Sequence, residues 1–323
     1  MEYLPWVEKY RPQRIDEIIS HDQNIETIKK MLEGRSLPHL LFHGTPGTGK
    51  TSLILAIANE LYGAQKNLMV MKLDASDDRG INSVREEIKG FAEKVNMFQK
   101  GIKLIILDEA DSMTFDAQFA LRRIIEKYSR TTRFCLICNY ENKIIPAIRS
   151  RCANFRFSPI SSNHVEKKLE GICKKENLAY ESNVLLTISL LSKGDLRKSI
   201  NFLQSLSLQS NNITVEMCYK LAGVPTLNEV IDIMDTLLDP NIDYDKANDK
   251  VNQLIKFQGY SLSTVLKEII SYLLLNSKLL NKIHSDRLAN YFSDMADLEN
   301  RVTRSTFGDI YMSGLVGIFK KYD

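Results

Sequence analysis

Short apolar segments alternate with amphipathic segments over the first half of the chain. The apolar segments have the length of buried strands, and they cover residues 40–42, 68–73, 104–107, 134–138 and 155–157. The segment that follows the first of them repeats apolar residues at helical spacing, at Leu53, Ile54, Ile57 and Leu61. Such alternation is typical of a parallel sheet covered by helices. We therefore predict an α/β fold for residues 1–160.

The strand pattern stops after Pro159, and only helical spacing follows. Four helices are predicted next, separated by Asn, Gly and Ser positions, over residues 162–176, 182–192, 195–206 and 214–221. The sequence Gly223-Val224-Pro225 then breaks the pattern, and the remainder carries helical spacing alone. We therefore predict a small helical domain at residues 161–224 and a third, all-helical domain at residues 225–323.

Length and composition limit the classes of protein to be considered. At 323 residues the chain exceeds what one hydrophobic core usually supports. No apolar run approaches the ~20 residues of a membrane span, and no signal peptide is present, so we expect no membrane partner. Five cysteines, an odd number, favour an intracellular, reducing compartment over a disulfide framework. The net charge of +3 is too small to indicate nucleic-acid binding by itself.

Two of the cysteines form a C-x-x-C motif, which is found in metal and redox sites. Cys135 and Cys138 fall inside the apolar run 134–138, however, and no second Cys or His pair has ligand spacing. We therefore expect both thiols to lie in a buried strand.

Residues 44–51 fill every fixed position of the phosphate-binding pattern G-x-x-x-x-G-K-[ST]. A predicted strand precedes them and a predicted helix follows, which is the context that the pattern requires. Backbone N–H groups of such a loop close around the β-phosphate at the helix N-terminus. Lys50 is expected to reach the β- and γ-phosphates, and Thr51 to offer its hydroxyl to Mg²⁺. The sequence thus predicts a nucleoside triphosphate site.

Polar residues follow two further predicted strands. Asp108 and Glu109 come after strand 104–107, at the edge of a parallel sheet where ligands bind. Asp108 is placed to hold Mg²⁺, and Glu109 to polarise the water that attacks the γ-phosphate. Asn139 follows strand 134–138, where it could bind the γ-phosphate or that water, or could simply form a turn.

Arginines outside these strands have two possible roles. Arg149 and Arg151 precede the strand at 155–157. Both are solvated surface residues, or one of them is an arginine finger, which is a cation supplied to the active site of another subunit. Arg197 follows Asp195, a good N-cap residue, at the start of a helix in the second domain. It could close over the nucleotide or remain a surface residue.

These motifs, in this order, resemble those of the small subunits of replication factor C, the clamp loaders of the AAA+ ATPase class in eukaryotes and archaea. The resemblance spans most of residues 4–224. It is carried by residues 6–12, 44–51, 74–80, 107–113, 120–123, 150–152 and 194–197. The last third contains no recognisable motif but has the helical character of that family's collar domain. The resemblance implies an AAA+ P-loop parallel-sheet domain, a small helical lid and an all-helical C-terminal collar.

The resemblance also implies ATP and Mg²⁺ as cofactors and assigns roles by position. The catalytic residues would be Glu109, Asp108, Lys50, Asn139 and, acting in the site of an adjacent subunit, Arg151. Mg²⁺ would be held by Thr51 and Asp108. The nucleotide would be bound by an adenine-pocket segment, the phosphate loop and two sensor residues, namely Val7, Tyr10, Arg11, Pro12, Gly44, Thr45, Pro46, Gly47, Thr48, Gly49, Lys50, Thr51, Ser52, Asn139 and Arg197.

The implied partners are the other large and small replication factor C subunits in a heteropentamer, the sliding clamp PCNA and primer–template DNA. Arg79, Arg85 and Lys143 occupy positions that track DNA phosphates in the family, and such contacts carry no sequence information. Residues 91–100 would face the clamp or belong to the core. The expected location is the nucleus, or the replication compartment of a large DNA virus.

Two departures from the family pattern and three rival functions remain open at this point. Arg149 stands where Gln is expected and could replace the finger or neutralise the loop, and Lys198-Ser199 stand where a second Arg and Ala are usual. The rivals are a non-hydrolysing scaffold subunit, an AAA+ branch-migration or helicase motor, and a free-standing kinase. We expect an ATPase subunit that loads the clamp during DNA replication.

Overall fold

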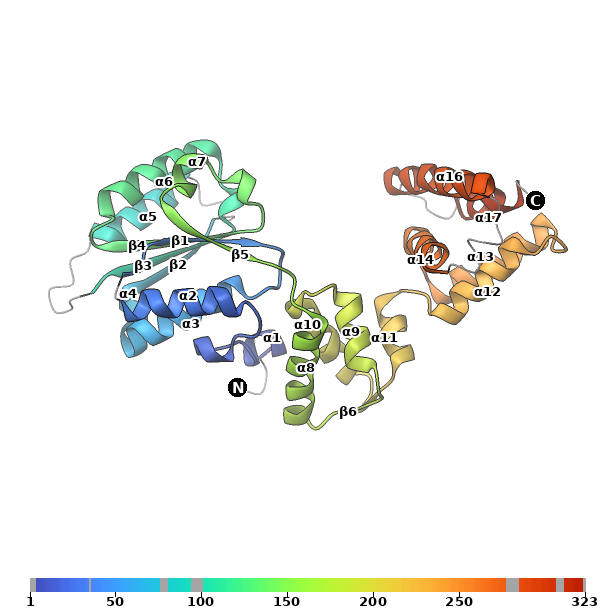
Figure 1. Cartoon of the computed structure of the whole chain (residues 1–323), viewed down its shortest axis with the longest axis horizontal. Helices are drawn as coiled ribbons and strands as arrows, with labels where there is room; N and C mark the ends of the chain where they lie inside the picture. The colour runs from blue at the N-terminus through green and yellow to red at the C-terminus, as the bar shows by residue number, and fades with distance from the viewer. Residues whose placement is uncertain are drawn as a thin grey trace. The chain divides into compact units, whose positions relative to one another are not determined.

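The computed structural model describes residues 4–34, 36–75, 81–93, 101–276, 285–305 and 311–321, without the side chains of residues 81–85 and 285. The chain forms two compact units, residues 1–211 and 212–323 (Figure 1). No helix within the described residues is long and apolar enough to span a bilayer.

The first unit contains a five-stranded parallel sheet in the order β2-β3-β4-β1-β5. The strands are β1 His39–Gly44, β2 Val70–Asp74, β3 Lys103–Asp108, β4 Thr132–Cys138 and β5 Cys152–Phe157. Pairing of Leu41 with Leu136 and of Leu107 with Leu136 keeps β1, β3 and β4 in register, so their carboxyl ends meet at one edge. The predicted α/β fold is confirmed.

Helices cover both faces of this sheet (Figure 1). On one face lie α2 Asp22–Glu33 and α3 Lys50–Tyr62, and on the other lie α5 Ile81–Glu93, α6 Phe115–Tyr128 and α7 Pro146–Arg149. Successive residues of a strand point to opposite faces, so Leu40 and Phe42 pack with α3, whereas Leu41 packs with α6. Burial on both faces explains why these strands read as continuous apolar runs.

Short helices fill several of the connections, and one of them corrects a predicted boundary. These are α1 Trp6–Lys9, η1 Ile15–Glu17, η2 Gly63–Gln65, α4 Lys66–Met69, η3 Ala110–Ser112 and η4 Glu141–Lys143. The predicted strand at 68–73 begins only at Val70, because Leu68 and Met69 belong to α4. Leu68 is 62% exposed, so its hydrophobicity does not reflect burial in the sheet.

Three lid helices complete the first unit. They are α8 Ser162–Glu176, α9 Val184–Ser192 and α10 Leu196–Ser207, with the two-residue strand β6 Ala179–Tyr180 between α8 and α9. Asp195 caps α10 as expected, since its carboxylate accepts a hydrogen bond from the backbone N–H of Lys198 at 2.9 Å. Gly194 precedes it with a φ of 78°.

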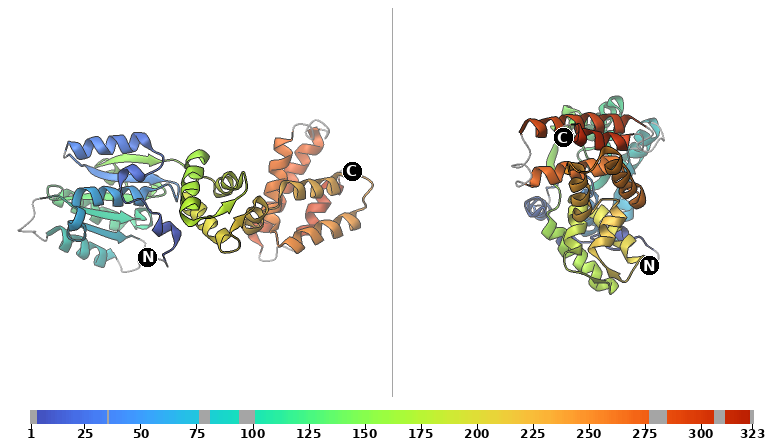
Figure 2. Two further views of the ribbon diagram at one scale, coloured as in Figure 1. Left: turned by 90° about the horizontal axis from the view of Figure 1, so that it is seen from below. Right: turned by 90° about the vertical axis from the view of Figure 1, so that its right-hand side faces the viewer.

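The second unit is mostly helical, as predicted. It contains β7 Asn212–Ile213, α11 Val215–Ala222, α12 Leu227–Leu238, α13 Tyr244–Gln258, α14 Leu262–Leu275, α16 Ser285–Arg304 and α17 Met312–Lys320 (Figure 2). The two-residue strands β6 and β7 were not predicted, because segments of that length show no periodicity.

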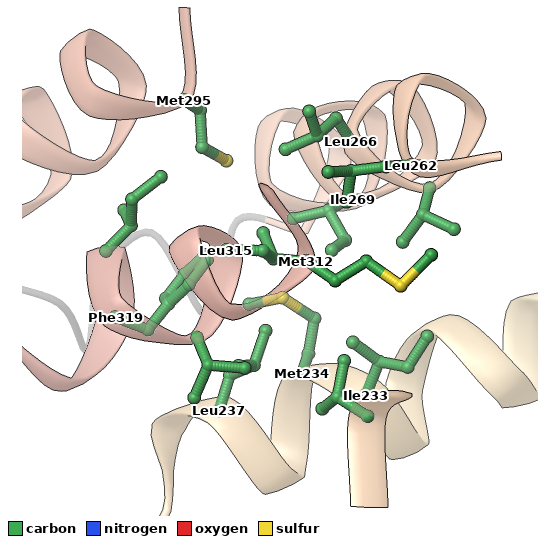
Figure 3. Packing of buried hydrophobic residues seen from close by; sticks show 14 of the residues in the cluster. Ile233, Met234, Leu237, Leu262, Leu266, Ile269, Met295, Met312, Leu315 and Phe319 are labelled. Atoms are coloured by element: carbon green, nitrogen blue, oxygen red, sulfur yellow. The ribbon is translucent and has the colours of Figure 1, made fainter. Parts of the chain in front are cut away.

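One apolar core holds the helices of the second unit together (Figure 3). Leu237 of α12, Ile269 of α14 and Phe319 of α17 are fully buried within it, and Met312 points into the space between α12 and α14. The helix α12 begins with a capping box, in which Thr226 and Glu229 each satisfy the other's backbone N–H.

Candidate nucleotide site

The carboxyl edge of the sheet opens onto a cavity of about 240 Å³. Most of the residues predicted to bind nucleotide or to act in catalysis line it, namely Val7, Tyr10, Arg11, Pro12, Pro46, Gly47, Thr48, Gly49, Lys50, Thr51, Ser52, Asp108, Glu109, Asn139 and Arg197. Residues 109 and 139 directly follow β3 and β4, and the loop at 45–49 follows β1. The topology of the sheet thus brings together segments that lie almost a hundred residues apart.

Lys50 connects the phosphate loop with the end of β4. Its side chain is buried, and its ammonium donates hydrogen bonds to the carbonyl oxygens of Gly44 at 2.7 Å and Thr45 at 2.8 Å. It also donates to Oδ1 of Asn139 at 3.1 Å. Gly44 and Thr45 do not line the cavity but contribute through these carbonyls. Burial lowers the pKa of Lys50 from its usual value, while Asp108 and Asp111 oppose that effect.

Two oxygen donors suited to Mg²⁺ lie side by side. The hydroxyl of Thr51 donates to Oδ2 of Asp108 at 3.1 Å, and Lys72 lies 3.5 Å from the same carboxylate oxygen. Mg²⁺ in such sites is usually held by one or two protein ligands together with substrate phosphates and water. The donor set therefore fits a magnesium–nucleotide complex.

Glu109 has an unusual backbone conformation. Its φ is 53°, in the left-handed region that non-glycine residues rarely adopt. The turn is held by Ser112, whose backbone N–H and hydroxyl both donate to the carbonyl oxygen of Glu109, at 2.9 Å and 2.7 Å. Such strain concentrates at functional sites. The side chain of Glu109 lies at the cavity wall and is exposed, so it can reach a bound water.

Asp111 and Gln118 support the segment that carries Asn139, and no role was predicted for either of them. Asp111 accepts hydrogen bonds from the backbone N–H groups of Asn139 at 3.2 Å and Tyr140 at 3.1 Å. The side chain of Gln118 is buried, donates to the carbonyl of Lys143 and accepts from the N–H of Ile145. Both contacts depend on tertiary structure, so no local pattern could have revealed them.

The first residues of the described chain form a wall of the cavity that is anchored at two places. The backbone N–H of Trp6 donates to Gln204 of α10 at 3.0 Å. Lys9 forms an ion pair of 2.5 Å with Glu176 of α8, and the hydroxyl of Tyr10 donates to the same carboxylate.

Residues 6–15 form an N-terminal arm, and the last residues of this arm are bonded to helix α3. The N–H of Ile15 donates to Glu60 at 2.9 Å, and Asn59 donates to the carbonyl of Gln13 at 3.0 Å. Arg11 and Pro12 lie between the residues bonded to the lid and those bonded to α3, and both line the cavity.

The lid contributes a backbone contact and two cations. The N–H of Leu196 donates to the carbonyl of Gly47 at 3.1 Å, and Arg197 lines the cavity as predicted. Lys168 of α8 also lines it, and burial lowers the pKa of this lysine. No role was predicted for Lys168, because a lysine within a helix usually indicates a solvated surface.

The predicted finger residue lies elsewhere. Arg151 does not line the cavity, and it pairs with Glu126 of α6 at 2.6 Å. Arg149 lies 3.6 Å from Glu141, and its Nε is buried with no partner among the described residues. Arg149 and Arg151 thus have different carboxylate partners.

The residues predicted to contact DNA and the clamp are described only in part. Lys143 is exposed and lies over the ring of Tyr140. Arg79, the side chain of Arg85 and residues 94–100 fall outside the described part of the chain. Phe91 is partly buried and packs against the core of the sheet domain.

The C-x-x-C cysteines are buried in β4, as expected. Burial raises the pKa of the Cys138 thiol to about 12 and raises that of Cys135 as well, so neither thiol is ionised at neutral pH.

Family models match three successive parts of the chain. The model of the ATPase family associated with various cellular activities (AAA) covers residues 40–160. The model described as RCF1/5-like, AAA+ ATPase lid domain covers residues 167–208, and that of the replication factor C C-terminal domain covers residues 225–317.

Relatives of known name are similar over nearly their whole length. Probable replication factor C subunit 5 of Dictyostelium discoideum is 46% identical, and the match covers 99% of this chain and 91% of the relative. Replication factor C subunit 5 of Homo sapiens is 42% identical, over 98% and 92%. Replication factor C subunit 3 of Saccharomyces cerevisiae is 39% identical, over 99% and 94%.

Solved structures of RuvB from Thermotoga maritima share the fold. One variant superposes with a TM-score of 0.55 at 17% identity, covering 83% of this chain and 91% of that chain. Identity this low supports a common architecture and says nothing about activity.

Proposed function

Because the chain belongs to the replication factor C family, we propose that it uses ATP to load the sliding clamp PCNA onto primer–template DNA. It is an AAA+ ATPase subunit of a multi-subunit clamp loader.

The convergence of Lys50, Thr51, Asp108, Glu109 and Asn139 on one cavity is the observation that carries the proposal. A subunit that only binds nucleotide as a scaffold has no need of a carboxylate beside the γ-phosphate position. Glu109 is present at the cavity wall, on a strained turn. We therefore favour hydrolysis at this site over a purely structural role.

Each of these residues has a distinct task in our proposal. Lys50 exchanges carbonyl partners for phosphate oxygens, and Asn139, already 3.1 Å from its ammonium, orients the γ-phosphate or the attacking water. Glu109 polarises that water, while Arg197 approaches the phosphates from the lid. Thr51 and Asp108 would hold Mg²⁺, which neutralises charge on the phosphates when bound. Val7, Tyr10 and Arg11 enclose the base.

We further propose that Arg151 serves the site of an adjacent subunit. Support comes from its absence among the residues lining this chain's own cavity and from the multi-subunit assembly of the family. A cation supplied in trans stabilises charge on the transferring phosphoryl group. The active site of this chain would then require a corresponding arginine from its other neighbour.

The remaining assignments are proposals of the same kind. Large and small replication factor C subunits would assemble with this chain through residues 225–323, with 161–224 as the lid. Arg79, Arg85 and Lys143 would contact DNA phosphates without reading sequence. The similar subunits of Dictyostelium discoideum, Homo sapiens and Saccharomyces cerevisiae come from eukaryotes, which supports a role in nuclear replication.

Replacement of Glu109 by Gln tests the proposed hydrolysis. The amide keeps the size of the side chain but cannot act as a base, so nucleotide binding should persist while hydrolysis falls by at least about 100-fold. The complex is assembled with its partner subunits, clamp and primed DNA. A photoreactive ATP, labelled on the α-phosphate and crosslinked after a fixed time, then reports the ratio of ADP to ATP on each subunit separately.

The expected result is that this chain retains ATP, whereas the neighbouring sites still form ADP. Asp116→Asn is the matched control, because Asp116 is exposed on α6 and lies outside the cavity. An unchanged ADP fraction on the Glu109→Gln chain would refute the role of Glu109. Normal hydrolysis without clamp loading by the wild-type complex would refute the loading function itself.

A further inference from the structure

Glu126 connects two arginines at the surface of the sheet domain. It lies on α6, one helical turn after Arg122, whose Nε donates to Oε1 of Glu126 at 3.0 Å. The same oxygen lies 2.6 Å from Nη2 of Arg151, which follows α7 in the sequence. One carboxylate oxygen therefore links α6 to the segment that carries the proposed finger.

A second acceptor fixes the orientation of the Arg151 guanidinium. Its Nη1 donates to the carbonyl oxygen of Ala147 at 2.7 Å, within α7. The planar guanidinium is thus held by Glu126 on one side and by Ala147 on the other. Two contacts to different elements restrict a long side chain that would otherwise sample many rotamers.

The contacts leave part of the guanidinium available. Arginine has five N–H donors, and the hydrogen bonds and ion pair of Arg151 engage its two terminal nitrogens. Its Nε has no acceptor among the described residues. The side chain is 35% exposed and that of Glu126 is 41% exposed, so both lie at a surface that another subunit can reach.

The charges also favour binding of an anion here. Glu126 offers one negative charge to two guanidinium groups, so the group of three side chains keeps a net positive charge. The pKa of Glu126 is held below its usual value, first by the hydrogen bond from Arg122 and also by Arg151, so the carboxylate stays ionised at neutral pH. Arg122 thereby helps to keep Glu126 in place, and the three side chains together retain one positive charge.

We propose that Glu126 is a positioning residue for Arg151, which it holds with unused N–H donors directed at the phosphates of an adjacent subunit's nucleotide. This inference rests on the proposed role of Arg151 in trans. Glu126 itself does not touch the nucleotide. Its effect is preorganisation, because a guanidinium that is already oriented need not be ordered as the transition state forms.

The test follows hydrolysis at the adjacent site in the assembled complex, using the labelled photoreactive ATP. We expect Glu126→Ala to slow ADP formation on the neighbouring subunit about 10-fold, because Arg151 is no longer oriented. Nucleotide binding at this chain's own cavity should not change. Glu126→Gln keeps the volume and one acceptor oxygen, so its effect should be smaller.

The double variant Glu126→Ala/Arg151→Ala separates positioning from general damage. If Glu126 acts through Arg151, the double variant hydrolyses at the rate of Arg151→Ala alone, since residues that act as a unit are not additive. Glu26→Ala is the matched control, because Glu26 forms a similar one-turn ion pair, with Lys30 at 2.7 Å, on a different helix, α2. It should leave hydrolysis at the neighbouring site unchanged.

The outcomes for the two roles can be told apart. The positioning role is wrong if Arg151→Ala slows hydrolysis at the neighbouring site but Glu126→Ala does not. It is also wrong if adding Glu126→Ala to the Arg151→Ala variant slows hydrolysis at the neighbouring site by the same factor as Glu126→Ala alone. If Arg151→Ala has no effect on the neighbouring site, the finger assignment fails, and the inference about Glu126 fails with it. Thermal unfolding of each variant shows whether α6 remains folded.

Discussion

The backbone N–H of Leu196 donates a hydrogen bond to the carbonyl oxygen of Gly47 at 3.1 Å. This contact joins the first residue of lid helix α10 to the middle of the phosphate loop. It requires an unusually close approach, because a Cβ atom built on Gly47 would lie 1.7 Å from Oδ1 of Asp195. Gly47 also has a φ of 68°. Both the close contact with the lid and the backbone conformation of the loop therefore require glycine at position 47.

We expect Gly47→Ala to weaken ATP binding by at least about 10-fold, or about 1.4 kcal/mol, because the loop or the lid must shift. Binding can be measured by titration with a fluorescent ATP analogue. Gly171→Ala is the control, since Gly171 lies within α8 and a Cβ there meets no atom within 4 Å. That variant should bind normally and be more stable by about 0.5–1 kcal/mol. Equal binding by both variants would contradict the steric explanation.

The hydroxyl of Tyr10 links the part of the cavity that we propose for the base to Glu176 of the lid. Tyr10→Phe removes this hydrogen bond and keeps the ring, so ATP affinity should fall about 3- to 10-fold through a less ordered wall. Binding of inorganic tripolyphosphate should not change, because that ligand has no base. Tyr62→Phe is the control, since its hydroxyl donates to the carbonyl of Ile102 and Tyr62 does not line the cavity. Equal weakening of both ligands would show that Tyr10 affects the phosphate loop instead.

His39 makes the stability of the chain depend on pH. Burial, with a smaller contribution from Arg133, lowers the pKa of His39 to about 4. Its neutral Nδ1 accepts a hydrogen bond from the N–H of Phe134 at 3.2 Å. Between pH 6.5 and about 4 the unfolded chain binds a proton at His39 that the folded chain does not, so stability falls as the pH falls through this window.

For this partly buried group we expect a loss of about 2 kcal/mol across the window. Urea unfolding at several pH values measures it. His39→Asn retains an acceptor but does not titrate, so its stability should change less with pH than that of the wild type. If the free energy of unfolding changed equally with pH in the two proteins, His39 would be ruled out as the source of the pH dependence.

The helices of the second unit depend on close packing around Leu237. This side chain is fully buried between neighbouring helices (Figure 3). Leu237→Ala should lower the free energy of unfolding by about 2–5 kcal/mol, because it leaves a cavity that the core cannot refill. Phe257→Ala is the control, since Phe257 is 89% exposed, and its effect should stay within about 0.5 kcal/mol. Chemical denaturation followed by circular dichroism measures both, and similar losses would contradict this role of Leu237.

The fold could be predicted from sequence where burial is complete on both faces of a strand. Residues 104–107 and 134–138 are continuous apolar runs because helices cover both sides of the sheet. The start of β2 was misplaced because Leu68 is apolar yet exposed on α4. Hydrophobicity reports burial only on average, and an exposed leucine is indistinguishable in sequence from a buried one.

The site was predictable to the extent that its chemistry is local. The phosphate loop and the carboxylates after β3 are motifs of fixed spacing, and the structure places them at one cavity. Asp111 and Gln118 act through contacts with segments distant in sequence, and Lys168 reaches the cavity from a lid helix. Their residue types are common on ordinary surfaces and turns. Their positions become informative only when the topology is known.

The arm at residues 6–15 is bonded both to the lid and to helix α3 of the sheet domain. Trp6, Lys9 and Tyr10 are bonded to the lid, whereas Gln13 and Ile15 are bonded to α3 beneath the sheet. A rotation of the lid relative to α3 would therefore be taken up between Tyr10 and Gln13, at Arg11 and Pro12, which line the cavity. Under the proposed function, the same few residues that enclose the nucleotide would also be the joint about which its enclosure opens.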